Sequence, residues 1–391
     1  MKIARIEAFP IQSDMKGALY KGDGTEGRRP PWTKGAEVAG PMSGYARFKK
    51  LRSTWRYDGA VGCLVTAEDG TTGFGMTRYD LPVIHLVNDH FAPLLVGEDC
   101  MAIERLWDMM VRMASPYGVA GIPSYAISAV DLALWDLKGK LLGQPVYALA
   151  GGPVRDDLFV YATGNDTDWH MELGFRGTKL ACPYGLFDGL DGLARNEALV
   201  AERREMVGPD VELMLDCWMA FDVEFAVRLS ERLKPYGLRW IEDCLLPENA
   251  EAHDELRRRL PGQTLATGEH WYALQSFATA CTRRMADILQ PDICWAGGFT
   301  GCRKIAQLAE AHGLEVCLHA GANTPYGQHL SVTSPAIRWA EYFVGGAPGV
   351  PLEENRVFPT MPVPVGGRIA PSDAPGFGLE MTDALLESMR R

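Results

Sequence analysis

Residues 211–216, VELMLD, form a short apolar run that ends in an acid, and this arrangement recurs along the second half of the chain. The run is suited to burial as a strand up to Leu215, whereas Asp216 leaves it as a carboxylate. An aspartate at the end of a buried strand needs water, a cation or a hydrogen-bond partner. The neighbouring runs therefore decide whether Asp216 belongs to a larger group.

Eight such runs follow one another from residue 158 to residue 343. Most of the segments between them have the apolar period of amphipathic helices, as in 222–235 and 301–313. Short strands that alternate with helices predict an α/β fold with a (β/α)8-type barrel. The runs are 158–164, 177–182, 211–216, 238–243, 264–269, 286–292, 314–320 and 337–343.

The residues before the barrel pattern predict a second domain of α+β type. Strand patterns cover 1–15 and 61–76, the latter with an Asp69-Gly70 turn, and helical periodicity follows. The polar stretch 21–55 is too long for a plain connector. Loops of this length are usually disordered or functional, and the functional interpretation predicts a lid over a site. The helical patterns cover 81–93, 101–113 and 128–143, with Gly143 as the C-cap.

We therefore expect three parts of the chain. Residues 1–127 form a capping domain that carries the lid, and residues 128–350 form the barrel with the catalytic site. Residues 351–391, rich in Pro and Gly, run back to cover the capping domain.

Composition narrows the class of protein. The chain of 391 residues carries a formal charge of −11, which argues against nucleic acid as a partner. It begins with an alternating strand pattern rather than a signal peptide, and no stretch approaches the roughly 18 apolar residues of a membrane span. The nine cysteines form no CxxC pair, so we expect reduced thiols, a cytoplasmic protein and no cysteine-based zinc site.

Each run from the third to the eighth ends in or beside an ionisable residue. These residues are spaced 22 to 27 positions apart, about the length of one β/α unit, so all should lie at the C-terminal mouth of the barrel. A single carboxylate there is typical of a helix N-cap, and a lone histidine of a satisfied core residue. An ordered series of six favours function instead. Its members are Asp216, Glu242, Glu269, Asp292, His319 and Glu341.

The first three acids suit a metal. Asp216, Glu242 and Glu269 offer oxygen ligands from three consecutive strands, which fits Mg2+ better than zinc. Asp292 and His319 follow on the next two strands and suit a dyad, in which the carboxylate orients the imidazole as a general base. Glu341 could then share a proton with a substrate oxyanion.

Three further residues keep more than one interpretation. His270, beside Glu269, is a second acid/base group or a loop residue. Lys179 on the second strand binds a substrate carboxylate or belongs to the metal site, unless it is structural. Arg52, in FKKLRSTW, is a lid residue or part of a solvated helix face.

The ordered set, together with AVDLALWDLKGKLLGQPVYALAGG, resembles the mandelate racemase-like branch of the enolase superfamily over nearly the whole chain. The segments LMLDCWM, LRWIED, TGEH and LQPDICWAGG are most similar to the L-rhamnonate dehydratases, which are Mg2+-dependent acid-sugar dehydratases. The resemblance implies the same three metal ligands, the same dyad, and Glu341 as the stabiliser of an enediolate. It also implies that His270 matches the histidine of the GEH motif, and that barrels of this kind assemble as homo-oligomers.

The sequence departs from that pattern at three places. Ala181 stands where many relatives carry a second lysine, which argues against two-base racemisation. Pro31 replaces an expected lid histidine, and the loop after His319 also differs, so the identity of the sugar acid stays open.

The implied reaction is dehydration of an aldonic acid such as L-rhamnonate to a 2-keto-3-deoxy acid. His319 would remove the C2 proton, and His319 or His270 would protonate the leaving hydroxide, under a lid with Arg52 and Trp32. An epimerase or cycloisomerase with the same enediolate chemistry is the main alternative. A metal-dependent hydrolase and a sugar-acid binder without turnover are further ones.

Overall fold

The computed structural model describes residues 1–11, 27–48 and 59–390 of the chain, and the predicted lid residue Arg52 lies outside these ranges. An antiparallel sheet of order β1-β2-β3 forms the core of the capping domain. The turn between β2 and β3 contains the predicted Asp69-Gly70 pair. The strands are β1 (Ile3–Pro10), β2 (Ala60–Ala67) and β3 (Thr72–Arg78).

Helix α5 (Ile122–Leu142) packs directly on this sheet. A Cβ atom added to Gly73 or Gly75 of β3 would lie 2.0 or 2.1 Å from a backbone oxygen of α5, so only glycine allows this approach. The helix ends, as predicted, at Gly143, whose φ of 62° is left-handed. The other helices of this domain are α2 (Asp80–His85), a π-helical turn η4 (Leu86–Phe91), α3 (Ala92–Leu95) and α4 (Ile103–Ala114).

All eight predicted strand runs contain a barrel strand, although several strands are shorter than their runs. They are β4 (Leu158–Thr163), β5 (Gly177–Ala181), β6 (Glu212–Asp216), β7 (Ile241–Glu242), β8 (Leu265–Thr267), β9 (Ile288–Leu289), β10 (Glu315–Val316) and β11 (Trp339–Phe343). Neighbours in the chain pair in parallel from β4 to β10, and β11 pairs with β4. A single bridge from Val316 to Ile337 links β10 to the residues before β11, so the barrel is nearly closed.

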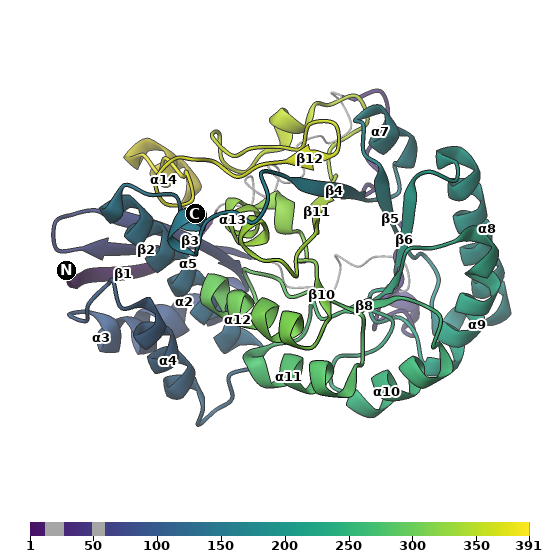
Figure 1. Ribbon diagram of the computed structural model, residues 1–391, viewed down its shortest axis with the longest axis horizontal. Coiled ribbons are helices and arrows are strands. Elements are labelled where there is room, and N and C mark those ends of the chain that lie inside the picture. The colour runs from purple at the N-terminus through teal and green to yellow at the C-terminus, as the bar shows by residue number, and fades with distance from the viewer. Residues whose placement is uncertain (12–26, 49–58, 391) are drawn as a thin grey trace.

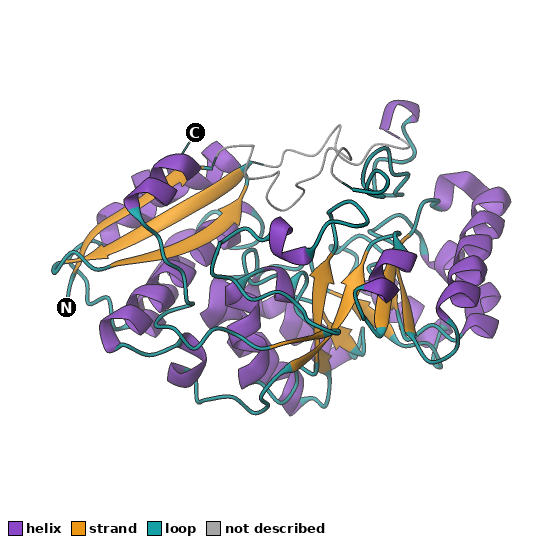
Figure 2. Ribbon diagram, turned by 90° about the horizontal axis from the view of Figure 1, so that it is seen from above, coloured by secondary structure: helices purple, strands orange, loops and turns teal. Residues whose placement is uncertain are grey.

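Helices surround the barrel, and the capping sheet lies to one side of it (Figure 1). Figure 2 shows the two sheets as separate bodies of strands. The predicted α/β barrel with an α+β cap is therefore confirmed. The barrel helices are α7 (Thr167–Glu172), α8 (Gly189–Val207), α9 (Val223–Leu233), α10 (Ala250–Arg259), α11 (Ala273–Arg283), α12 (Gly298–Ala311) and α13 (Pro325–Thr333), with short 3-10 turns η5 (Leu186–Asp188), η6 (Lys234–Tyr236) and η7 (Gly321–Asn323).

Alternation along the strands sends side chains inward and outward. Met214 belongs to a cluster inside the barrel, whereas Leu213 and Leu215 pack with apolar residues of α9. Asp216 lies two positions after Met214, so its side chain is expected on the same, inward face of the strand. The same rule applies to Trp240 and Glu242, so the inward positions become polar where the strands end.

The C-terminal segment returns to the capping domain, as expected. Strand β12 (Arg368–Ile369) pairs with β4 at the barrel, and Gly376 then bridges to Pro145 beyond α5. The final helix α14 (Asp383–Met389) lies beside the capping sheet (Figure 1), and Arg390 bridges to Ile11. One 3-10 turn, η8 (Leu352–Asn355), precedes this return, and η2 (Ala46–Phe48) lies in the N-terminal stretch.

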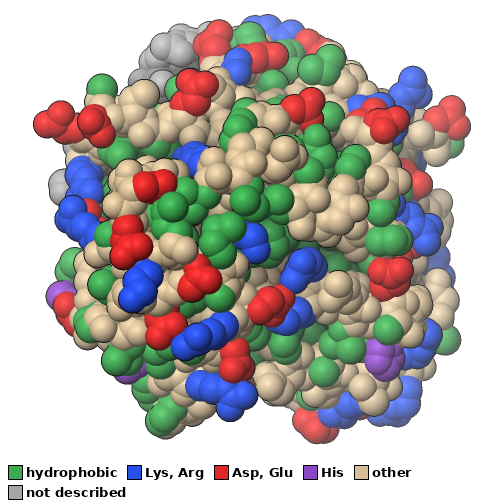
Figure 3. Space-filling model, turned by 60° about the vertical axis from the view of Figure 1, so that its left-hand side comes forward, with side chains coloured by type: hydrophobic (Ala, Val, Ile, Leu, Met, Phe, Trp, Pro, Cys, Tyr) green, Lys and Arg blue, Asp and Glu red, His purple; other side chains and the backbone are tan. Residues whose placement is uncertain are grey.

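On the face that Figure 3 shows, acidic and basic side chains are interspersed with hydrophobic ones, so neither sign of charge dominates it. Within the described residues, no helix is both long and apolar enough to cross a membrane.

Candidate active site

Three carboxylates meet at the barrel mouth. Asp216 ends β6, Glu242 ends β7, and Glu269 follows β8 by two residues. Each can offer an oxygen such that all three oxygens lie within 4.8 Å of one another, and all three side chains are buried. Three buried carboxylates at such distances repel one another unless a cation lies between them. The donor set consists of hard oxygens, so these residues fit Mg2+.

Neutral donors hold all three of these carboxylates in place. The indole Nε1 of Trp218 donates to Glu269 at 3.1 Å, and the backbone N–H of the same residue donates to Asp216 at 3.0 Å. Glu242 Oε2 accepts from Trp240 Nε1 at 2.8 Å and from Gln290 Nε2 at 2.7 Å. The ligands are therefore oriented before any ion binds.

Lys179 lies beneath this group and is fully buried. Its ammonium pairs with Glu242 and, at 2.8 Å, with Glu341. Burial disfavours the charged lysine, but the two carboxylates outweigh it and raise the pKa of Lys179 well above its ordinary value. Of the two functional interpretations, this position favours the metal site, because the amine already contacts one of its carboxylates.

The charge at Glu242 shows how crowded the site is. Burial, together with Asp216, Glu341 and Glu269, raises the pKa of Glu242 to about 8, although Lys179 opposes the shift. Without a metal, burial and the neighbouring carboxylates therefore make the charged form of Glu242 costly. A divalent cation would offset that cost.

Asp292 and His319 form the predicted pair. Asp292 Oδ2 lies 2.7 Å from His319 Nδ1, and His319 Nε2 points toward Glu269 at 3.5 Å. Burial disfavours the imidazolium, but Glu269 and the hydrogen bond to Asp292 outweigh it and raise the pKa of His319 to about 9. A cation between the carboxylates would offset the effect of Glu269 and lower this pKa toward the range in which a general base works.

His270 has a partner of its own. Its Nδ1 lies 3.3 Å from Asp243 Oδ2 and 3.2 Å from Glu269 Oε1. Asp243 is held in turn by Thr267 Oγ1 at 2.9 Å. The ring contacts a metal-ligand carboxylate from the turn after β8, which favours the acid/base interpretation over the loop residue.

Glu341 accepts three hydrogen bonds. Their donors are Thr163 Oγ1 at 2.5 Å, the Ala320 N–H at 2.8 Å and Lys179 Nζ at 2.8 Å. Burial favours the protonated acid, but Lys179 and His319 outweigh it and hold the pKa of Glu341 below its ordinary value. Sharing a proton with substrate therefore requires that a substrate oxyanion beside Glu341 raise its pKa.

A cavity of about 260 Å3 opens onto five of these groups, namely Asp216, Glu269, Asp292, His319 and Glu341. Of the two predicted lid residues, Trp32 lines the cavity. Its indole Nε1 donates a hydrogen bond to the Val344 carbonyl at 3.2 Å, and its backbone N–H donates one to the Asp166 carboxylate at 2.8 Å. Arg29 pairs with the same Asp166 carboxylate at 3.0 Å, which ties this stretch to the start of α7.

Sequence reasoning missed several side chains that hold the site. Trp240 and Gln290 lie two positions before Glu242 and Asp292, so the inward alternation of their strands was the signal that could have found them. Thr163 lies at the same level of β4. Asp243 gave no such signal, because a left-handed φ of 49° turns it out of the strand pattern.

Comparison with known proteins agrees with this geometry. The family model described as Enolase C-terminal domain-like matches residues 167–385. The model of the mandelate racemase / muconate lactonizing enzyme N-terminal domain matches residues 52–151. The chain therefore belongs to the enolase superfamily, in its mandelate racemase and muconate lactonizing enzyme branch.

Individual relatives are similar over most of the chain. The L-rhamnonate dehydratase of Saccharopolyspora erythraea is 40% identical over 350 residues, which cover 88% of this chain and 89% of that protein. The structure of rhamnonate dehydratase from Gibberella zeae complexed with Mg has a TM-score of 0.90 and 33% identity, and covers 100% of this chain and 96% of that one. The 3,6-anhydro-D-galactonate cycloisomerase of Zobellia galactanivorans has a TM-score of 0.78 and 25% identity, with 100% of both chains covered.

Proposed function

We propose that this protein is a Mg2+-dependent hydro-lyase that dehydrates a sugar acid of the L-rhamnonate type to a 2-keto-3-deoxy acid. The observation that carries the proposal is the Asp292–His319 pair, whose second imidazole nitrogen lies 3.5 Å from Glu269 of the carboxylate cluster. Two relatives that align with most of this chain are named rhamnonate dehydratases, and the structure of one of them was determined in complex with Mg.

Asp216, Glu242 and Glu269 would hold the Mg2+ ion. When bound there, the ion would make the C2 proton of a bound acid more acidic and stabilise the charge of the enediolate. Lys179 beneath the cluster keeps the net charge of the carboxylates low enough for both folding and binding.

The remaining steps belong to side chains of this chain. His319, oriented by Asp292, removes the proton from C2, and the imidazolium formed is stabilised by Asp292 and Glu341. The hydroxide on C3 leaves with a proton from His319 or from His270. Trp32 covers the cavity and excludes water from the substrate.

The second candidate is a cycloisomerase with the same first step. It is favoured by the likeness to the Zobellia galactanivorans cycloisomerase. An epimerase is a weaker alternative, because Ala181 replaces the second lysine that would act as a base on the opposite face.

The test is a screen of purified protein with Mg2+ against aldonic and aldaric acids, with semicarbazide detection of 2-keto acids. We expect turnover of L-rhamnonate or a close relative, and a loss of roughly 1,000-fold or more in kcat for Asp292→Asn and for His319→Asn. Asp191→Asn, on the exposed face of α8, serves as the matched control. If a 2-keto product forms only from acids of another stereochemical series, the mechanism stands and L-rhamnonate is excluded as the substrate.

Exchange of the C2 proton with solvent deuterium separates the alternatives. Exchange without a 2-keto product would favour the cycloisomerase or epimerase. The absence of both exchange and product across the library would contradict enediolate chemistry altogether.

Three further expectations remain proposals. We propose a homo-oligomer in the cytoplasm, supported by the resemblance and by nine free thiols, and light scattering of the purified protein tests the assembly. The domain limits at residues 127/128 and 350/351 likewise stay predictions. Arg52 stays a predicted lid residue outside the described ranges.

A further inference from the structure

The catalytic cavity has two chemically different walls. At the barrel mouth it is lined by the charged groups described above, among them Asp216, Glu269 and His319. On the side of the capping domain the lining is mostly apolar and comes from distant parts of the chain, with Thr77 and Arg78 of β3 as its polar members. The apolar residues are Ile11, Ala60, Met76, Val357 and Met389.

Met389 is the last residue of α14, so the C-terminal helix reaches the catalytic cavity. Its side chain is fully buried. It joins the same apolar cluster as Ile11 and Val357. A thioether there offers a substrate dispersion contacts and only a weak hydrogen-bond acceptor.

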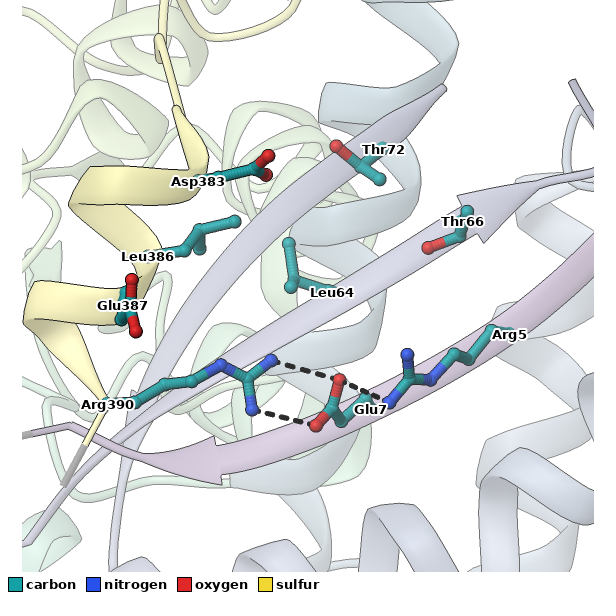
Figure 4. Close-up of a pocket in the computed structure, with 9 residues that line it drawn as sticks. All are labelled: Arg5, Glu7, Leu64, Thr66, Thr72, Asp383, Leu386, Glu387 and Arg390. Carbon is teal, nitrogen blue, oxygen red and sulfur yellow. Dashed lines mark hydrogen bonds and ion pairs between the residues drawn. The ribbon is translucent and has the colours of Figure 1, made fainter. Parts of the chain in front are cut away.

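The residue after Met389 fixes the end of the helix. The guanidinium of Arg390 donates to both carboxylate oxygens of Glu7 on β1, at 2.8 and 3.0 Å, and its Cζ lies 4.0 Å from the ring centroid of Phe9. Figure 4 shows this bidentate pair, with Arg5 on the other side of Glu7. The two parallel bonds hold the end of α14, and with it Met389, in one position.

The residue one turn before Met389 lies in a different environment. Leu386 lines an outer groove of about 400 Å3 between α14 and the sheet, together with Arg5 and Glu7 (Figure 4). It is absent from the lining of the catalytic cavity. The helix therefore offers an apolar side chain outside the catalytic cavity that is a matched control for Met389.

We propose that Met389 is a specificity-determining residue, which contacts the end of the substrate remote from its carboxylate and selects an apolar, deoxygenated end over a hydroxymethyl group. The proposal rests on the proposed function, in that the carboxylate end lies at the metal-ligand cluster. The Glu7–Arg390 pair positions Met389. A hydroxyl group against Met389 loses its hydrogen bonds to water and gains at most a weak one from the thioether.

The test compares two acids that differ only at C6, L-rhamnonate and its 6-hydroxy counterpart L-mannonate. In the Mg2+-loaded enzyme, we expect Met389→Gln, which keeps the volume but adds an amide, to lower the ratio of their kcat/KM values about tenfold. Met389→Leu stays apolar and should keep the ratio within about threefold. Leu386→Gln, on the outer groove, should leave the ratio unchanged.

Two readouts keep the outcome decisive. If Met389→Gln fails to fold, Arg390→Ala releases the end of α14 and is expected to lower the same ratio at least about threefold. Calorimetric titration of both acids into wild type and Met389→Gln measures the ratio as affinities, without turnover. An enzyme that dehydrates neither acid would overturn the proposed function, while the affinity ratio still decides the role of Met389.

The proposal is overturned if the folded Met389→Gln variant keeps the wild-type ratio, or if Leu386→Gln changes it equally. A protein that binds neither acid overturns both the proposed function and the role of Met389.

Discussion

At the scale of single residues, Lys179 explains how so many acids share one barrel mouth. The ammonium group is fully buried between Glu242 and Glu341. A buried charge with partners is tolerated, whereas removal of one partner leaves the others uncompensated. Lys179 is thus both a structural residue and the source of positive charge beside the metal ligands.

We expect Lys179→Met to lower the free energy of unfolding by about 3–5 kcal/mol in the absence of Mg2+, because two buried carboxylates lose their partner. Urea titration of the metal-free protein measures this change. Lys234→Met is the control, since its exposed pair with Glu231 should contribute less than about 0.5 kcal/mol. A change of less than about 1 kcal/mol at Lys179 would show that the carboxylates accept protons at no cost.

At the scale of elements, the contact of α5 with α12 joins the capping domain to the barrel. Asp131 of α5 is fully buried, and its Oδ2 accepts a hydrogen bond from the Thr300 N–H in the first turn of α12 at 2.9 Å. Burial raises the pKa of Asp131 to about 7, and the hydrogen bonds from Thr300 only partly oppose it. Protonation of this carboxyl therefore favours the folded state.

This pKa gives a pH dependence of stability with a definite sign. In the unfolded chain Asp131 titrates near 3.8, and in the folded protein near 7. Between these values the folded state binds the extra proton, so its contribution to stability falls as pH rises from about 4 to about 7 and is constant above. Asp131→Asn should remove that slope.

The measurement is the urea midpoint of wild type and Asp131→Asn between pH 5 and pH 8. Asp108→Asn on the exposed face of α4 is the matched control and should keep the wild-type slope. Parallel slopes for wild type and Asp131→Asn would contradict the assignment.

At the scale of the whole molecule, the cavity is built from segments that are far apart in sequence. The barrel supplies the metal ligands and the dyad, the capping domain supplies Met76, and the C-terminal helix supplies Met389. Ion binding at the carboxylate cluster should therefore stabilise the whole fold, because the ligands come from three successive barrel strands.

We expect millimolar Mg2+ to raise the thermal unfolding midpoint and EDTA to reverse the effect. At 100 times the dissociation constant, the gain is about 2.7 kcal/mol. Asp216→Asn should abolish this gain without lowering the metal-free stability, because it also removes one of the repelling charges. A thermal unfolding midpoint that does not change with Mg2+ would contradict the metal site. So would an Asp216→Asn variant whose midpoint rises with Mg2+ as much as that of the wild type.

The sequence predicted the barrel well because each strand run carries its own local evidence. The runs 158–164 and 337–343 coincide closely with β4 and β11. The run 286–292 shortens to Ile288–Leu289, because backbone pairing in the barrel ends before the apolar pattern does. The helix predicted over 128–143 begins earlier, at Ile122, with Pro123 in its first turn.

The candidate site was predictable to the extent that it follows strand order. Asp216, Glu242 and Glu269 could be grouped because strand ends of a barrel share one face. The double pairing of Lys179 and the contact of His270 with Asp243 depend on side-chain packing across strands. Spacing along the chain carries no information on those distances.

The sequence by itself determined the order of the strands, the acid or histidine at the mouth of six of them, and the family resemblance, since these depend on local pattern and position in the repeat. Only the tertiary structure decided which charged side chains pair with each other and which segments, remote in sequence, line the cavity. Met389 reaches that cavity because the chain returns through β12 and α14 to the capping sheet. Contacts between residues hundreds of positions apart arise from burial of the whole molecule, which no local pattern records.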